Sequence, residues 1–243
     1  MSTVLITGGA KRIGAEISQF FASKGFDIAL HCNKSRDIAE KHADFLRAKY
    51  QIMCKVYQFD LENITEVPNF FSQIVCDFKQ ISVLINNASF FEKSTIKTAT
   101  PDTLLQNFAV HFFSPIILAQ SFAKQDGLED GLIINFLDKN TNRTKTQYFE
   151  YIQSKKSLWE LTKYLAVELA PKIRTNAISP GFIIEEEGSS VDVEYLKAKF
   201  TSIPLQRKGS INDIILAVEY LLNAKYVNGQ NLFVDGGASL LND

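Results

Sequence analysis

The sequence predicts an α/β fold in which a parallel sheet is covered by helices on both faces. Short, wholly apolar segments alternate with segments of helical periodicity along all 243 residues. The apolar segments are continuous and do not alternate with polar residues, as is typical of strands buried on both faces. No linker rich in glycine, serine or proline divides the chain, so we expect one domain over residues 1–243.

Each element is predicted from a local pattern and from the glycines and prolines at its ends. Glycines at 8 and 9 end the first strand, Gly25 ends the first helix, Pro101 starts a long helix, and Pro180-Gly181 ends the sixth strand. The expected strands are Val4–Ile6, Phe26–His31, Ile52–Phe59, Ile81–Ile85, Leu132–Leu137, Ile173–Ile178 and Leu232–Val234. The expected helices are Ile13–Phe21, Ala39–Tyr50, Val67–Phe78, Pro101–Lys124, Tyr151–Leu169, Glu194–Phe200 and Ile211–Leu222.

Composition excludes several classes of protein. A formal charge of −1 gives no overall attraction to nucleic acid or to an anionic membrane. Three widely spaced cysteines without a C-x-x-C pair argue against a disulfide framework and a zinc site, and suit a reducing compartment. No apolar run approaches the roughly 20 residues of a transmembrane helix, and no signal-peptide pattern follows Met1. We therefore expect a cytoplasmic protein without a metal site.

A candidate catalytic group follows the fifth expected strand. Tyr151 and Lys155 are four positions apart, so on a helix they share one face. An ammonium beside a phenol stabilises the phenolate and is expected to lower its pKa from about 10 towards working pH. The carboxylate of Asp138, at the end of the strand, could face the same place.

A glycine-rich turn, Thr7–Gly14, joins the first strand to the first helix. Glycines there let the backbone approach a pyrophosphate, whose charge is favoured by the free N–H groups of the helix start. The spacing differs from G-x-G-x-x-G, and the alternative is a turn that only reverses the chain. The expected contacts with a cofactor are Gly8, Lys11, Arg12, Ile13 and Gly14.

The end of the second strand decides between cofactors. NAD-specific sites place an acid about 20 residues after the glycines, to bind the ribose 2′-hydroxyl. Here the residues are His31, Asn33, Lys34, Ser35 and Arg36, with no acid before Asp37. Lys34 and Arg36 could pair with a 2′-phosphate, which favours NADPH; the alternative is a solvated basic turn before a helix.

Taken together, these motifs resemble the short-chain dehydrogenase/reductase family. The resemblance is carried by T-G-x-x-x-[G/R]-x-G from Thr7, Asn86-Asn87-Ala88, Tyr151-x-x-x-Lys155 and Pro180-Gly181, and spans almost the whole chain. It implies a Rossmann-like sheet of seven strands in the order 3-2-1-4-5-6-7, a substrate lid at about 182–205, and a homotetramer. It also implies further cofactor contacts at Asp60, Leu61, Asn87, Ala88, Ser89, Lys155, Pro180 and Gly181.

Two departures from the family pattern point to a narrower branch. Asp138 stands where members usually carry serine, and His111 where they usually carry asparagine. Together with Ser89-Phe90-Phe91, Tyr148, Tyr151 and Lys155, they resemble the pteridine reductases. The resemblance implies reduction of a dihydropterin (dihydromonapterin, dihydrobiopterin or dihydrofolate) with NADPH. In such an enzyme Tyr151 donates a proton with help from Lys155 and Asp138, and Ser89, Phe91 and Tyr148 line the pocket.

Other interpretations stay open from the sequence. Phe91 could be part of the core, Tyr148 a surface residue, and His111 a buried histidine or a proton relay. A carbonyl or 3-oxoacyl reductase is a second enzymatic reading, and an NADP-binding sensor without turnover is a reading of another class.

Overall fold

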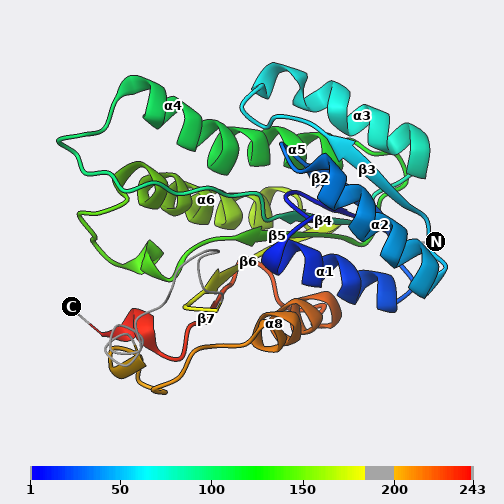
Figure 1. Ribbon diagram of the computed structural model, residues 1–243. Coiled ribbons are helices and arrows are strands. Elements are labelled where there is room, and N and C mark those ends of the chain that lie inside the picture. The colour runs from blue at the N-terminus through cyan, green and yellow to red at the C-terminus, as the bar shows by residue number, and fades with distance from the viewer. Residues whose placement is uncertain (1, 184–199, 242–243) are drawn as a thin grey trace.

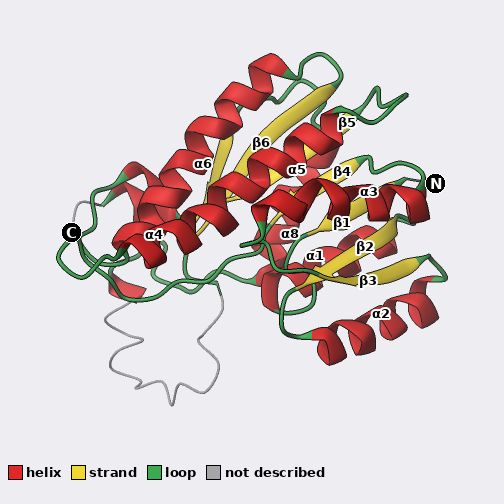
Figure 2. Cartoon of the chain, turned by 90° about the horizontal axis from the view of Figure 1, so that it is seen from above, coloured by secondary structure: helices red, strands yellow, loops and turns green. Residues whose placement is uncertain are grey.

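The computed structural model describes residues 2–183 and 200–241, which fold around one parallel sheet of seven strands (Figure 1). The strand order is β3-β2-β1-β4-β5-β6-β7. Figure 2 shows the strands side by side from β3 to β6, with α2 beyond the edge strand β3. The predicted fold class and strand order are confirmed. The strands are β1 (Thr3–Ile6), β2 (Asp27–Cys32), β3 (Cys54–Gln58), β4 (Val83–Asn86), β5 (Gly131–Phe136), β6 (Ile173–Pro180) and β7 (Asn231–Val234).

Helices cover both faces of this sheet. On one face α1, α2 and α8 share a core with Val4 and Ile6 of β1, and on the other α3, α5 and α6 share a core with Leu5. Successive residues of a strand point to opposite faces, so burial on both explains the continuous apolar runs of the sequence. The helices are α1 (Arg12–Ser23), α2 (Arg36–Tyr50), α3 (Val67–Phe78), α4 (Pro101–Phe108), α5 (Ser114–Ala123), α6 (Phe149–Glu168) and α8 (Ile211–Asn223).

The helix expected over Pro101–Lys124 is interrupted. A π-helical turn, η2 (Ala109–Phe113), separates α4 from α5. Pro115 has no N–H to donate to the carbonyl of His111, and its ring would collide with that carbonyl in a regular α-helix. The ladder of hydrogen bonds therefore changes at His111, and the widened turn buries this side chain.

Three short helical turns complete the described chain: η1 (Ile64–Glu66), η3 (Lys139–Asn142) and η4 (Ala238–Leu240). Of the expected lid at 182–205, residues 184–199 lie outside the described residues, and with them nearly all of the helix expected at Glu194–Phe200. Among the helices that the structure does describe, none has the length and apolar character needed to cross a membrane.

Candidate active site

The predicted site residues gather where the strands end. The loops after β1, β2, β4, β5 and β6 all leave the sheet at its carboxyl edge, because the strands are parallel. In open α/β sheets this edge is where ligands bind.

The glycine turn is shaped for close approach of a phosphate. A Cβ on Gly14 would lie 2.1 Å from the Gly8 carbonyl oxygen, and a Cβ on Gly8 would lie 2.9 Å from the Cα of Ala88. Helix α1 begins after Lys11, whose side chain makes no capping hydrogen bond to the first N–H groups. The uncapped N–H groups of α1 can bind the pyrophosphate of a dinucleotide, and the lack of side chains at Gly8 and Gly14 lets it come close to the backbone.

Asn87 and Thr7 join this turn to the end of β4. The Asn87 side-chain amide donates to the carbonyls of Thr7 and Gly8, each at 3.0 Å. The Thr7 hydroxyl accepts from the backbone N–H groups of Asn87 at 2.9 Å and Ala88 at 3.0 Å. The two loops therefore form one rigid wall of the site.

His31 supports the turn from beneath. Its side chain is buried, Nδ1 accepts from Gly8 N–H at 3.1 Å, and Nε2 donates to the Phe59 carbonyl at 2.9 Å. Burial lowers the pKa of His31 to about 4, so the imidazole is neutral at pH 7. The ring acts on a cofactor through the position of Gly8, because it has no exposed surface with which to touch one.

The charged groups expected at the 2′-phosphate lie close together beyond β2. Asn33, Lys34 and Arg36 are exposed, and Ser35 immediately precedes α2. Arg36 makes one long ion pair within α2, with 3.8 Å between its Nε and Glu40 Oε1. These side chains can turn toward a phosphate at little cost, because surface ion pairs contribute little.

Other predicted contacts lie along the same edge. Asp60 is exposed after β3, while Leu61 is buried and its carbonyl accepts from the Ser114 hydroxyl at 2.6 Å. Pro180 ends β6, and Gly181 packs so closely on β7 that a Cβ would lie 2.5 Å from the Cα of Asp235.

The three predicted catalytic residues come together beside this wall. Tyr151 Oη donates to Asp138 Oδ2 at 3.2 Å, and Asp138 Oδ1 accepts from Asn140 N–H and from its side-chain amide, each at 2.8 Å. The buried Lys155 Nζ donates to the Phe136 carbonyl at 2.7 Å and lies 5.8 Å from the centre of the Tyr151 ring. The carboxylate is thus fixed by η3, and the ammonium by the end of β5.

One electrostatic expectation was wrong. The pKa of Tyr151 is raised well above 10, first by burial and then by the charge of Asp138 and the hydrogen bond to it. The expected lowering of the Tyr151 pKa by Lys155 is not found, because desolvation and the adjacent carboxylate determine the shift. Burial also lowers the pKa of Lys155 to about 8, although Asp138 opposes this shift. Tyr151 is therefore a protonated phenol at working pH.

Three aromatic side chains line the open side of the site. The Phe91 side chain is 45% exposed, which excludes the alternative that it belongs to the core. Its ring centre lies 5.6 Å from that of Tyr148 and 5.8 Å from that of Tyr151. Tyr148 caps α6 with a positive φ of 58°, a conformation that non-glycine residues rarely adopt outside constrained sites.

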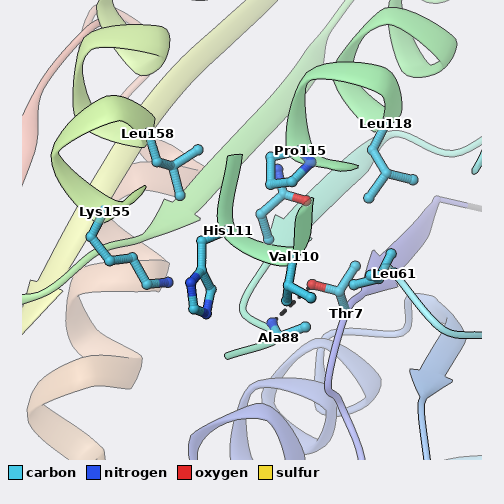
Figure 3. A pocket seen from close by; sticks show the side chains of 10 residues that line it. Thr7, Leu61, Ala88, Val110, His111, Pro115, Leu118, Lys155 and Leu158 are labelled. Carbon is cyan, nitrogen blue, oxygen red and sulfur yellow. Dashed lines mark hydrogen bonds between the residues drawn. The ribbon is translucent and has the colours of Figure 1, made fainter. Parts of the chain in front are cut away.

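A small internal cavity lies behind the catalytic residues. Figure 3 shows His111 and Lys155 extending toward it from η2 and α6. It has room for about one water molecule. Asn86 lines it as well; its Nδ2 donates to Asn135 at 2.8 Å, whereas its buried Oδ1 has no partner among the described residues.

Glu150 is a site residue that sequence reasoning missed. It is buried in the first turn of α6, and accepts from the Ser94 hydroxyl and, at 2.9 Å, from Thr103 Oγ1. It ties the segment after β4 and the start of α4 to the catalytic helix. An acid in the first turn of a helix is common on dipole grounds, so its type and position give no specific signal.

The comparisons with known proteins agree with this geometry. A family model described as enoyl-(acyl carrier protein) reductase matches residues 8–239. The crystal structure of FolM alternative dihydrofolate reductase 1 from Brucella suis in complex with NADP superposes with a TM-score of 0.92 at 34% identity, covering 100% of this chain and 96% of that one.

Curated relatives carry more than one activity in their names. The uncharacterized oxidoreductase YohF of Escherichia coli is 30% identical over 98% of this chain and 96% of its own length. Pteridine reductase 1 of Leishmania tarentolae is 29% identical over 97% and 96%, and the 3-oxoacyl-[acyl-carrier-protein] reductase FabG of Staphylococcus aureus 27% over 97% and 97%. With the glycine turn, the Tyr151/Lys155 pair and the sheet order in place, the chain belongs to the short-chain dehydrogenase/reductase family, which uses nicotinamide cofactors.

Proposed function

We propose that the protein is an NADPH-dependent reductase of dihydropterins, the class that includes dihydromonapterin, dihydrobiopterin and dihydrofolate. The observation that carries the proposal is the hydrogen bond from Tyr151 to the carboxylate of Asp138, at the position where the family usually has serine. A ketone needs a hydroxyl to polarise its oxygen. A pterin ring presents nitrogens and an amino-pyrimidine edge. A carboxylate can accept hydrogen bonds from this edge, and a phenol can donate one to a ring nitrogen.

The cofactor assignment rests on charge and on the relatives. Lys34 and Arg36, with Arg12 in the glycine turn, offer cations to a 2′-phosphate, and no acid stands at the ribose position before Asp37. The similar structure from Brucella suis was crystallised with NADP. NADPH, when bound, supplies the hydride for the reaction.

The chain's own residues then supply the proton. Tyr151 is protonated and can donate to the ring nitrogen beside the carbon that receives the hydride, so the C=N bond becomes CH–NH. Asp138 already accepts from Tyr151 and is only partly buried, so it can take up a proton from solvent and pass that proton to the phenolate. We expect Lys155, which is charged below about pH 8, to bind the hydroxyls of the nicotinamide ribose.

The aromatic side chains account for binding of a flat substrate. Phe91 presents an exposed face next to Tyr151 and Tyr148, and an aromatic pair in offset or edge geometry contributes about 1 kcal/mol beyond its buried area. A pterin stacked on Phe91 would lie within reach of Tyr151 and Ser89. A flexible ketone gains less from such a surface.

The test is turnover of dihydropterins with NADPH, followed by the absorbance loss at 340 nm, in the wild type and in Asp138→Ser. The substitution should lower kcat/KM for the pterin about 100-fold or more, the usual weight of a general acid–base group. Asp126→Ser is a matched control, because Asp126 is exposed in the loop before β5, at the opposite edge of the sheet. If the wild type reduces a 3-oxoacyl substrate better than a dihydropterin, or if Asp138→Ser raises its activity, the protein is a carbonyl reductase. If it binds NADPH but reduces none of these substrates, it is the NADP-binding sensor.

We also propose that the enzyme is a homotetramer assembled through α4, α5 and α6. Large apolar side chains are exposed on α4 and α6, Leu105 at 64%, Tyr164 at 67% and Val167 at 81%. Light scattering tests this, and a stable monomer at micromolar concentration would refute it.

A further inference from the structure

His111 lies between the Ser89–Phe90 segment after β4 and helix α6, which carries Tyr151 and Lys155. The π-helical turn η2 buries its side chain, leaving 1% exposed. Nε2 lies 3.2 Å from Ser89 Oγ and 3.4 Å from the Phe90 nitrogen, and Nδ1 lies 3.0 Å from Ser154 Oγ. The ring also meets the Tyr151 ring edge to face, with 5.4 Å between centres and 84° between planes.

These contacts fix where the proton of His111 sits. A backbone N–H can only donate, so the contact from Phe90 requires Nε2 to be the unprotonated acceptor. Nδ1 then carries the hydrogen and donates to Ser154 Oγ. The Ser154 hydroxyl in turn donates to the Tyr151 carbonyl at 2.8 Å, and Ser89 is left to donate to Nε2. Only the neutral Nδ1–H form satisfies every partner.

The same chain of hydrogen bonds cannot deliver protons. It runs from Ser89 through His111 and Ser154 and ends on the Tyr151 carbonyl inside α6. A peptide carbonyl has no proton to give, so nothing at this end can replace a proton that leaves toward Tyr151 Oη. The charged group that lines the cavity with His111 is Lys155, which disfavours a second positive charge.

We propose that His111 is a positioning residue that, as a permanently neutral hydrogen-bond acceptor, holds the Ser89–Phe90 segment in place under the substrate. The role differs from the proton relay considered from the sequence. The contact holds Ser89 and, one residue beyond Phe90, Phe91, whose exposed ring has its centre 5.8 Å from that of Tyr151. The proposal for His111 rests on the proposed function only in the choice of a pterin as the probe.

Two amide substitutions separate positioning from relay. The glutamine amide reaches the place of Nε2 and can keep its acceptor, whereas the asparagine amide reaches only the place of Nδ1. Neither side chain titrates. We expect His111→Gln to keep KM for dihydrobiopterin within about threefold, and His111→Asn to raise it roughly tenfold through loss of two hydrogen bonds. The dissociation constant for NADPH should stay unchanged in both, and so should the shape of the pH–rate profile.

A relay predicts a different pattern: both variants would lose kcat to the same extent, with KM unchanged. That outcome would overturn the proposal. If His111→Asn does not fold, the wild type alone still decides, because imidazole ¹⁵N shifts report protonation directly. We expect His111 to show a protonated Nδ1 and a bare Nε2 from pH 5.5 to 8.5, with His42→Gln and His31→Gln used to assign the three histidines.

A protonated Nε2, or titration with a midpoint between pH 6 and 8, would refute the positioning role. The ¹⁵N measurement needs no substrate. A wild type that reduces no dihydropterin but shows the neutral Nδ1–H form would therefore sink the proposed function and leave the role of His111 intact.

Discussion

His31 makes folding stability sensitive to mild acid. Its imidazole bridges the glycine turn and the end of β3, accepting from Gly8 N–H and donating to the Phe59 carbonyl. Protonation would place a hydrogen on Nδ1, directly against the N–H of Gly8. In the folded protein, His31 must therefore either lose the hydrogen bond from Gly8 or stay unprotonated to a lower pH than in the unfolded chain.

The size of the effect follows from the pKa. Burial lowers the pKa of His31 from 6.5 to about 4, and each unit is worth 1.36 kcal/mol, so the full difference is roughly 3 kcal/mol. Because the folded pKa lies below the unfolded one, the unfolded chain binds the proton first as the pH falls. This stability is complete above pH 6.5 and is lost toward pH 4. Between pH 7.5 and pH 5 the loss is about 2 kcal/mol.

The assay is urea unfolding at pH 7.5 and pH 5 for the wild type and His31→Gln. Glutamine does not titrate, so the wild type should lose about 2 kcal/mol more than the variant, while carboxylates shared by both cancel. His42→Gln is the comparison. Burial also lowers the pKa of His42, but His42 is less deeply buried than His31, so this variant should recover less of the loss than His31→Gln. Equal losses in the wild type and His31→Gln would refute the assignment of a buried, neutral His31.

Three further outcomes are expected. Lys34→Asp should reduce the preference for NADPH over NADH at least tenfold, because it removes a cation that pairs with the 2′-phosphate. Lys41→Asp, exposed on α2, should leave the preference unchanged. If the ratio of kcat/KM for NADPH to that for NADH is the same in Lys34→Asp as in the wild type, Lys34 does not belong to the phosphate site. Since burial lowers the pKa of Lys155 to about 8, the ammonium is present below pH 8 and kcat/KM should fall above it; a profile flat to pH 9.5 would contradict this. Glu150→Ala removes the acceptor that the partly buried Ser94 and Thr103 hydroxyls share, and should lower the free energy of unfolding in urea by roughly 1–3 kcal/mol. Exposed Glu168→Ala should change it by almost nothing, and equal losses in the two variants would refute a bracing role for Glu150.

The parts of the fold that sequence predicts are those set by local pattern. The strand of Val4–Ile6 is apolar throughout because both of its faces are buried, and that requirement is visible without coordinates. Gly8 and Gly14 are likewise dictated locally, since Gly8 adopts a positive φ of 62° and a Cβ on Gly14 would meet the Gly8 carbonyl oxygen. The predicted neighbours Asp138 and Tyr151 are also found together, because the end of a strand and the next helix must meet at one edge of the sheet.

The parts that sequence did not predict depend on contacts between distant segments. Helical periodicity continues through His111, and although Pro115 marks a break in the hydrogen-bond ladder, only the structure shows that the helix widens there and does not end. Glu150 braces Ser94 and Thr103, which lie 56 and 47 residues away. The pKa of Tyr151 depends on how completely the fold removes water from the phenol, and spacing between Tyr151 and Lys155 cannot reveal this.

The raised pKa of Tyr151 sharpens the choice between substrates. A carboxylate beside the phenol makes it a weaker acid than a serine would, which is a disadvantage unless the acceptor is a strong base. Hydride addition to a C=N bond places the developing negative charge on nitrogen, which is more basic than the oxygen formed from a ketone. A weak acid held by Asp138 can still protonate such a nitrogen, while the carboxylate remains available to accept an N–H from the ring. The substitution of serine by aspartate therefore favours C=N over C=O reduction on acidity as well as on hydrogen bonding.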